Sequence, residues 1–237
     1  MWEANKGYRR GFLWNHGLAK LSQSTQPGTN PMMKLYYAPG TCALASHIAL
    51  LDAGAAHEAI RVSFKDEEQK KPSYLAINPK ARVPSLVTDN GILTETPAIL
   101  AFVAQTHPDK KLAPLNDAFA FAQVQAFNSY LCSTVHVAHA HGRRGARWAD
   151  DQSAIAAMQR KVPQTMADCF ALIEKSMIKG PWVMGASYTI CDPYLYTIAT
   201  WLKGDEVDIE KFPKVRDHFA AMNERPSVRE ALRVQQA

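Results

Sequence analysis

Residues 34–54 read KLYYAPGTCALASHIALLDAG and carry three local signals in succession. An apolar run comes first, a Pro-Gly pair then breaks it, and apolar residues at helical spacing follow. Gly54 stands where a helix C-cap is expected, because glycine adopts the left-handed conformation there without a steric cost. The stretch therefore predicts a strand, a turn and a helix.

The residues that follow keep alternating between strand and helix signals. A second short strand is expected at 58–62. The runs SLVT and ILTE flank Asp89-Asn90-Gly91, and an Asn-Gly pair between apolar runs predicts a β-hairpin. Thr96 and Pro97 then open an amphipathic helix. This order predicts a small α/β domain.

Strand signals stop near residue 110, and helical spacing takes over. One long helix is expected from about Asp117 to beyond His141, and a second from Asp151 to Lys179, with Pro163 kinking or splitting it. Four segments result: a leader or upstream extension at 1–31, an α/β domain at 32–109, a linker at 110–116 and an all-helical domain at 117–237.

Composition narrows the class of protein. The 237 residues carry a net charge of +5, but Lys6, Arg9, Arg10 and Lys20 against Glu3 place +3 of it in the leader. The body is left with +2, which argues against a nucleic-acid surface. No apolar run is long enough to span a membrane. The four cysteines are scattered without a metal-ligand spacing, which indicates a reducing compartment, and we expect a cytoplasmic protein.

Cys42 follows the Pro-Gly turn, where the first helix should begin. Helix amides at that position favour a thiolate over a thiol, so Cys42 is a candidate reactive cysteine. The alternative is a small apolar residue packed at a helix start. Cys132, Cys169 and Cys191 lie on apolar helical stretches and are assigned to packing.

Two further motifs fit an amino-acid ligand. Val83-Pro84 precedes a hairpin strand and is a candidate cis bond that would offer the Val83 backbone to a peptide, or else a strand-start proline. Glu95 could meet an ammonium, while Thr96 and the helix amides could meet a carboxylate. An ordinary helix cap is the alternative.

Together, the segments KLYYAPGTCALASHIALLDAG, NPKARVPSL, LTETPAIL and TICDPYLY resemble the cytosolic glutathione transferases, most closely the bacterial beta class. The resemblance covers nearly the whole chain from Met33 onward. It implies a thioredoxin-like domain that binds glutathione, an all-helical domain that supplies much of the electrophile pocket, and a homodimer. Glutathione is then a co-substrate, and no separate cofactor or metal is expected.

The resemblance also assigns roles to single residues. It implies that Cys42 faces the glutathione sulfur and that Val83, beside a cis Pro84, pairs with the cysteinyl backbone. Glu95 and Thr96 would hold the γ-glutamyl end. His136 matches a catalytic position, and Thr189 with Asp192 matches a folding cap. Ser133, Thr134 and Lys65 are further candidates for contacts to glutathione, Lys65 for the glycine carboxylate.

Two positions depart from the beta-class pattern. Ala43 stands where that class has serine, and Val137 where it has a lysine after the histidine. Any cation that supports the thiolate must therefore come from elsewhere or be missing.

The segment HVAHAHGRRGARW at 136–148 allows other interpretations. His136 and His139 could ligate a metal, but no acidic or cysteine partner accompanies them in the sequence, and polar histidines are the preferred interpretation. Arginines 143, 144 and 147 could attract an anionic co-substrate, although complementing a helix C-terminus is favoured. Tyr37, Tyr130 and Trp148 are candidates for an aromatic pocket or for the core.

The leading hypothesis is a detoxifying transferase that conjugates the glutathione thiolate to small hydrophobic electrophiles. One alternative is a glutathione-dependent disulfide reductase that works through a mixed disulfide at Cys42. Another is a non-catalytic binding protein with the same fold.

Overall fold

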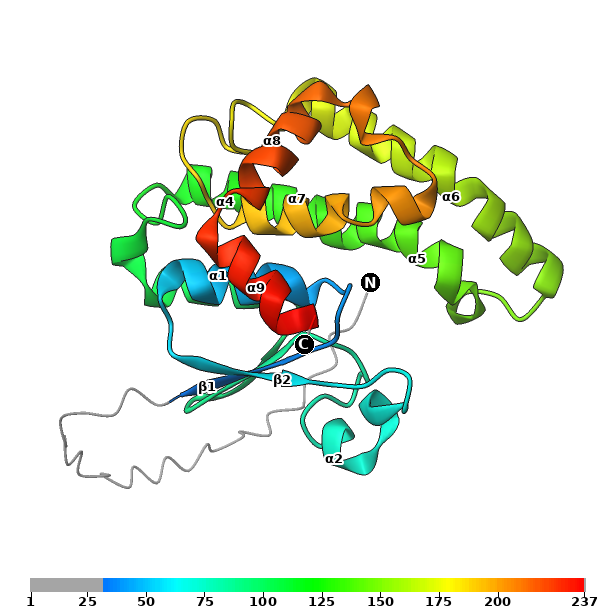
Figure 1. Ribbon diagram of the computed structural model, residues 1–237, viewed down its shortest axis with the longest axis horizontal. Helices are drawn as coiled ribbons and strands as arrows, with labels where there is room; N and C mark the ends of the chain where they lie inside the picture. Colours follow the sequence, from blue (N-terminus) through cyan, green and yellow to red (C-terminus); the bar gives the residue numbers. More distant parts are fainter. Residues whose placement is uncertain (1–31, 237) are drawn as a thin grey trace, which may run out of the picture. The chain divides into compact units, whose positions relative to one another are not determined.

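The computed structural model describes residues 32–236, so the predicted leader at 1–31 lies outside the described residues. A single mixed sheet forms the first part of this region, in the order β2-β1-β3-β4 (Figure 1). Its strands are β1 (Met33–Tyr37), β2 (His57–Arg61), β3 (Ser85–Thr88) and β4 (Gly91–Thr94). β1 runs parallel to β2 and antiparallel to β3, and the hairpin β3-β4 turns at Asp89-Asn90 as predicted.

Three helices accompany the sheet: α1 (Ala43–Ala53), α2 (Pro72–Leu75) and α3 (Thr96–Thr106). α1 ends at Gly54, which has a φ of 63° and whose N–H reaches the carbonyls of Leu50 and Leu51. The predicted glycine cap is therefore confirmed. In Figure 1, α1 lies above the sheet and α2 below it. The first part of the fold is the thioredoxin-like α/β domain that the sequence predicted.

The second part is helical, as expected. It consists of α4 (Ala118–Tyr130), α5 (His136–Arg144), α6 (Gln152–Leu172), α7 (Cys191–Ala199), α8 (Pro213–Asn223) and α9 (Pro226–Gln236). The change from strands to helices falls between β4 and α4, while the exact domain limits 32–109, 110–116 and 117–237 stay a prediction.

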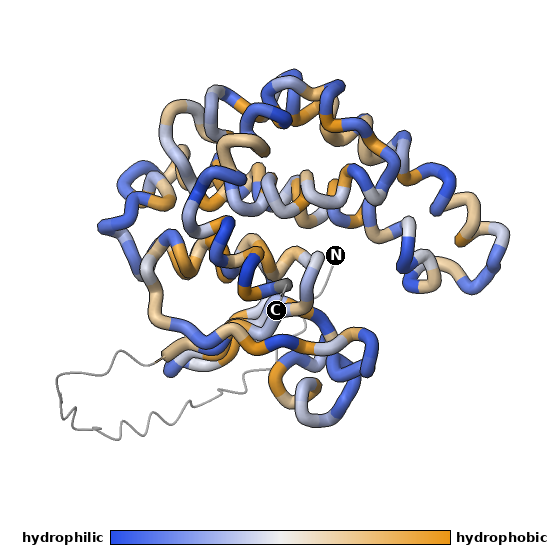
Figure 2. Tube along the Cα trace, viewed as in Figure 1, coloured by the Kyte–Doolittle hydropathy of each residue, from blue (hydrophilic) through white to orange (hydrophobic). Residues whose placement is uncertain are grey.

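The long predicted helices are interrupted differently from what the sequence indicated. A π-helical turn, Leu131–Val135, separates α4 from α5, and another, Ile173–Met177, follows α6. Pro163 does not split α6, which continues on both sides of it. Val162, Met166, Cys169 and Phe170 on the buried side of α6 keep their packing across the proline. Hydrophobic and hydrophilic residues accordingly alternate along α6 in Figure 2.

The two parts share one continuous core. Buried residues of β1, α1 and α3 belong to the same cluster as those of α4, α6 and α7. A polar contact adds to this packing where Asp52, at the end of α1, accepts from Arg225 at 2.7 Å and from the Tyr188 hydroxyl at 2.5 Å. The Arg225 guanidinium also lies 3.6 Å from the centre of the Tyr188 ring. The α/β part and the helical part are therefore held in a fixed relation around α1.

α7 begins one residue later than the Thr189 cap predicts, at Cys191. The predicted side-chain contacts are nevertheless present. Thr189 Oγ1 accepts from the Cys191 N–H at 3.3 Å, and the Asp192 carboxylate accepts from the Thr189 N–H at 2.6 Å. Asp192 also accepts from the Val183 N–H at 2.8 Å and lies 3.0 Å from His218 Nε2. Asp192 thus joins the start of α7 to the preceding loop and to α8.

Among residues 32–236, no helix is both long and apolar enough to cross a membrane.

Candidate active site

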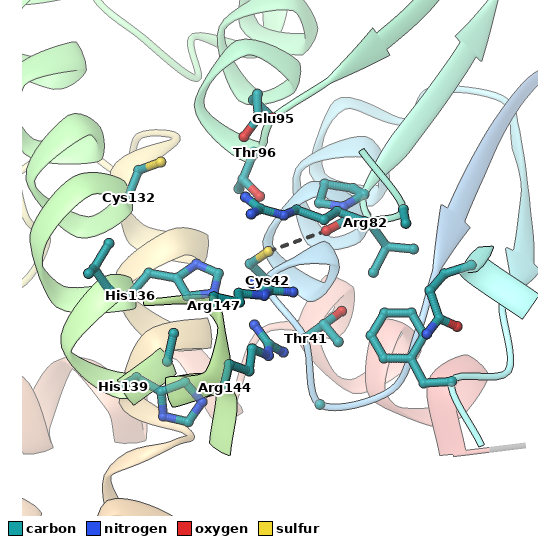
Figure 3. A pocket seen from close by; sticks show the side chains of 18 of the residues that line it. Thr41, Cys42, Arg82, Glu95, Thr96, Cys132, His136, His139, Arg144 and Arg147 are labelled. Atoms are coloured by element: carbon teal, nitrogen blue, oxygen red, sulfur yellow. Dashed lines mark hydrogen bonds between the residues drawn. The ribbon is translucent and has the colours of Figure 1, made fainter. Parts of the chain in front are cut away.

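A cavity of about 320 Å³ lies between the α/β part and the helical part (Figure 3). Four segments of the α/β part contribute to it: the turn before α1, the loop around Phe64 and Gln69, the loop before β3, and the start of α3. The facing wall comes from the π-helical turn, α5 and the 3₁₀ turn Gly145–Arg147 that follows α5. The cavity therefore brings together residues more than a hundred positions apart in the sequence.

Cys42 lies at the floor of this cavity as the N-cap of α1 and is only 9% exposed. Its Sγ donates a weak hydrogen bond to the Val83 carbonyl at 3.7 Å. Burial raises the pKa of the Cys42 thiol, and this outweighs the opposing effects of the Thr96 hydroxyl and the Arg144 guanidinium. The position at a helix start predicted a stabilised thiolate at Cys42, but burial favours the protonated thiol instead.

The loop before β3 presents a backbone edge to the cavity. The Val83-Pro84 peptide bond is cis, as predicted, and both residues line the cavity. Within residues 32–236, the Val83 N–H has no hydrogen-bond acceptor. The carbonyl of the preceding residue, Arg82, accepts from the Tyr74 hydroxyl and from Asn78 Nδ2, both at 2.7 Å. These bonds fix the loop and leave the Val83 N–H open to a ligand.

Glu95 and Thr96 stand together at the start of α3 and line the cavity. Glu95 has a φ of 73°, an unfavourable backbone conformation for a residue with a side chain. Its carboxylate forms an ion pair with Lys80, whose Nζ also donates to Thr94 Oγ1 at 2.7 Å. The Thr96 hydroxyl is buried and makes no hydrogen bond of standard geometry with the described residues, although it lies close enough to the Cys42 thiol to favour its thiolate. A buried, unpartnered hydroxyl beside helix N-terminal amides is suited to receive a carboxylate.

His136 faces Cys42 across the cavity from α5 (Figure 3). Its ring packs edge-on against Trp201, with the ring centres 4.9 Å apart. Burial, followed by the positive charge of Arg144 and the neighbouring His139, lowers the pKa of His136 to about 4. The imidazole is therefore neutral at pH 7, and it can donate a hydrogen bond to an anion while being a poor acceptor of a full proton.

His139 has an acidic partner that the sequence did not reveal. Its Nδ1 lies 2.7 and 2.9 Å from the two oxygens of Asp205, and its ring stacks on Trp201 at 4.3 Å. Asp205 comes from a turn 66 residues further on, so the expectation that the two histidines have no acidic partner is wrong. The preferred interpretation, a polar histidine satisfied by hydrogen bonds, is supported for His139 by the same contact. Within residues 32–236, no group of three or more His, Cys, Asp or Glu side chains is arranged to hold a metal ion.

Three arginines line the same cavity: Arg82, Arg144 and Arg147. Within the described part of the chain, none of the three forms an ion pair. In Figure 3 their side chains extend from opposite walls into the space around Cys42. Arg143 and Arg147 are both exposed and Arg144 is half-buried, but only Arg143 lies outside the cavity. Arg144 and Arg147 do lie at or just after the end of α5, as the preferred interpretation expected. That interpretation did not predict that they also line the cavity.

Other predicted site residues lie elsewhere. Lys65 is exposed and does not line the cavity. Ser133 and Thr134 are also exposed, and the Ser133 hydroxyl donates to the Ser129 carbonyl at 2.8 Å. Of the candidate aromatic residues, Trp148 lines the cavity, whereas Tyr37 is buried in the core and Tyr130 packs against it.

Sequence reasoning missed several cavity residues because their neighbours come from distant elements. Cys132, assigned to packing, lines the cavity and is only half-buried. Tyr194 and Trp201 also reach it, from α7 and from the residues after it. Arg82 lies inside the quoted motif NPKARVPSL, and its position directly before Val83 was the signal that could have identified it.

Comparisons with known proteins agree with this arrangement. The family model described as "Glutathione S-transferase, N-terminal domain" matches residues 31–105, and the one described as "Glutathione S-transferase, C-terminal domain" matches residues 141–233. Glutathione S-transferase GstA of Escherichia coli O157:H7 is 30% identical over 203 residues, covering 84% of this chain and 97% of that protein.

Two solved structures are similar over nearly their full length. A glutathione transferase homologue from Sulfitobacter with bound glutathione has a TM-score of 0.84 and 43% identity, covering 87% of this chain and 99% of that one. A bacterial beta class glutathione S-transferase from Sphingomonas chungbukensis has a TM-score of 0.74 and 29% identity, covering 85% and 98%. Fold, motifs and relatives agree, and the chain belongs to the cytosolic glutathione S-transferase family.

Proposed function

We propose that this transferase joins the thiolate of glutathione to small hydrophobic electrophiles. The observation that carries the proposal is the convergence, on one cavity, of Glu95 and Thr96 with cationic and polar groups around Cys42. In this proposal Glu95 binds the γ-glutamyl ammonium, and Thr96 with the α3 amides binds its carboxylate. The open Val83 N–H then pairs with the cysteinyl backbone, which brings the glutathione sulfur toward Cys42.

The sulfur needs positive neighbours because conjugation requires the thiolate. His136 is neutral and supplies a hydrogen bond at most. Arg144 lies seven residues after Val137, two helical turns along the same face of α5, and its charge acts on both Cys42 and His136. We assign to Arg144 the stabilising charge that the missing lysine would have given, with the thiol proton passing to solvent.

Removing the Thr96 hydroxyl is expected to weaken glutathione binding. A hydrogen bond to a carboxylate contributes about 1.5–3 kcal/mol, so Thr96→Val should raise the Kd of glutathione by a factor of about 10 or more. Isothermal titration calorimetry measures this directly. Thr106→Val, at the exposed opposite end of α3, is the matched control and should bind glutathione like the wild type. Unchanged affinity in Thr96→Val would remove Thr96 from the head-group site.

Disulfide reduction is the second candidate function, and two observations favour it. Cys42 lines the cavity on the α/β side, and Cys132 places a second thiol on the facing helical wall. The curated relatives also include disulfide-bond oxidoreductase YfcG of Escherichia coli strain K12, 24% identical, and a maleylpyruvate isomerase from Ralstonia sp, 29% identical. In this reaction the Cys42 thiolate would attack the substrate disulfide, form a mixed disulfide with one half of it and release the other half as a thiolate. The glutathione thiolate would then attack the substrate sulfur of that mixed disulfide, which restores the Cys42 thiolate and releases a disulfide between glutathione and the substrate. The raised pKa of Cys42, caused by burial, makes its thiolate scarce and counts against this route.

Cys42→Ala separates the two reactions. Conjugation of 1-chloro-2,4-dinitrobenzene should survive at least in part, because the attacking sulfur belongs to glutathione. Reduction of hydroxyethyl disulfide through a Cys42 mixed disulfide should instead fall by about 100-fold or more, since its nucleophile is gone. Cys169→Ala, buried in the helical core away from the cavity, is the control for general effects of cysteine removal. If Cys42→Ala abolishes conjugation while glutathione still binds, Cys42 takes a direct part in conjugation, and the expectation that it only lies beside the glutathione sulfur is wrong.

A homodimeric assembly, a cytoplasmic location and a role in detoxification belong to the same proposal. They rest on family membership, and size-exclusion chromatography with light scattering tests the first of them.

A further inference from the structure

Arg147 lies across the cavity from the residues that hold the head group and the backbone of glutathione under the proposed function. The head-group residues, Glu95 and Thr96, and the backbone edge at Val83 all belong to the α/β wall. Arg147 lies on the facing wall, in the 3₁₀ turn after α5, and its side chain extends toward the space around Cys42 (Figure 3). It is therefore placed on the side where a second reactant would approach the sulfur.

The surroundings of Arg147 are cationic and lack a compensating carboxylate. Arg147 forms no ion pair and no side-chain hydrogen bond with residues 32–236, and Arg82 and Arg144 line the same cavity. Burial, and then the like charges of Arg144 and Arg82, lowers the pKa of Arg147. Glu95, the one carboxylate on the cavity wall within the described residues, is already paired with Lys80. An anion that binds at Arg147 would therefore meet two further cations in the same cavity and no unpaired carboxylate among the described lining residues.

The residues next to Arg147 indicate the rest of the ligand. Trp148 lines the cavity and is 47% exposed, a large fraction for an indole ring. Val137 and Ala140 on α5 add apolar surface to the same wall. A guanidinium beside an indole and aliphatic groups suits a flat apolar molecule that carries a carboxylate.

We infer that the electrophile taken by this enzyme is an aromatic acid, with its carboxylate on Arg147 and its ring against Trp148. This deepens the proposed function by naming the substrate class. For a chloronitrobenzoate, the glutathione sulfur forms a bond to the ring carbon that bears chlorine. The chloride leaves with the electron pair of the broken carbon–chlorine bond, and the thiol proton passes to solvent.

The kinetic test compares 4-chloro-3-nitrobenzoate with 4-chloro-3-nitrobenzamide, which has the same ring and leaving group but no charge. Each kcat/KM is divided by the uncatalysed rate constant with glutathione, because the two rings differ in intrinsic reactivity. The wild type should favour the benzoate, and Arg147→Gln should reduce this preference by a factor of about 10, with the KM for glutathione changed less than about twofold. Arg143→Gln removes the same charge four residues earlier, outside the cavity, and should keep the wild-type preference.

Two kinetic results would overturn the inference. One is a wild type that handles both substrates alike after normalisation. The other is an Arg147→Gln variant that loses both substrates equally or loses affinity for glutathione, which would assign Arg147 to the thiolate or to the glycine carboxylate. Arg144→Gln provides the contrast, because its assigned role in stabilising the thiolate predicts equal losses with both substrates.

A binding measurement keeps the inference independent of turnover. 4-Methyl-3-nitrobenzoate has no leaving group, and calorimetry on the glutathione-saturated protein should show that it binds at least about tenfold more tightly than its amide, through Arg147. If the protein binds this acid through Arg147 but conjugates nothing, the acid site stands while the proposed transferase reaction fails. If conjugation proceeds but the acid binds no better than the amide, the transferase stands and the acid site is refuted.

Discussion

Replacing Asp192 with Ala is expected to lower the free energy of unfolding by about 3–5 kcal/mol, the usual cost of removing one partner from a buried, charged network. Asp192 is fully buried. Its loss leaves the N–H groups of Val183 and Thr189, together with the His218 ring, without their acceptor in a site closed to water. For a chain of this size the melting temperature should fall by about 6–20 °C.

Asp117→Ala provides the matched comparison. Asp117 is also a helix-start carboxylate, but it is exposed and accepts one bond, from the Ala120 N–H at 2.9 Å. Its removal should cost only about 1 kcal/mol. Thermal and urea unfolding of both variants measures the difference. Equal losses would mean that the Asp192 network contributes no more than a surface cap.

Acidification from pH 7 to pH 4 is expected to remove about 3 kcal/mol of stability through His47 alone. His47 lies on α1 and is 1% exposed, with its ring 5.2 Å from that of His57. Burial, followed by the charge of His57, lowers the pKa of His47 to about 4 from an ordinary value of 6.5. The folded protein therefore holds His47 neutral, whereas the unfolded chain takes up a proton below pH 6.5. The contribution of His47 to stability is complete above pH 6.5 and is lost as the pH falls toward 4.

His47→Gln removes the titrating group. The loss of unfolding free energy between pH 7 and pH 4 should therefore be smaller in this variant than in the wild type, by about 3 kcal/mol. The comparison uses this difference because the substitution also changes packing. His107→Gln, at the end of α3 and away from the buried pair, should keep the wild-type difference. His136, whose pKa is also lowered to about 4 by burial, will contribute further acid sensitivity that remains in His47→Gln. A His47→Gln variant as sensitive to acid as the wild type would contradict the prediction.

Elements with strong local signals could be predicted from the sequence. The hairpin turns at Asp89-Asn90, directly before Gly91, whose φ is 124°, and α1 ends at Gly54, because both places depend on the backbone preferences of single residues. The π-helical turn Leu131–Val135 could not be predicted, since its residues are compatible with an ordinary helix. Pro163 was expected to kink or split its helix, but packing of the α6 buried face keeps the helix continuous across it.

The candidate site divides in the same way. The residues of its α/β wall come from short contiguous sequence motifs. Cys42, Val83, Glu95 and Thr96 could therefore be proposed together as residues of one site. Its helical wall depends on which face of α5 and of the following turn meets the sheet. Spacing alone did not separate Arg144 and Arg147, which line the cavity, from Arg143, which does not. It also did not show that Cys132, which packs against the core as predicted, lines the cavity as well.

The sequence by itself determined the order of the main elements, the family and the motifs of the α/β cavity wall, because these depend on residues adjacent in the chain. Only the tertiary structure decided the charge and protonation of the cavity. Burial raises the pKa of Cys42 and lowers that of His136, and both effects follow from how much water the surrounding elements exclude. The convergence of three arginines and the pairing of His139 with Asp205 join distant segments of the chain, so no local pattern encodes them.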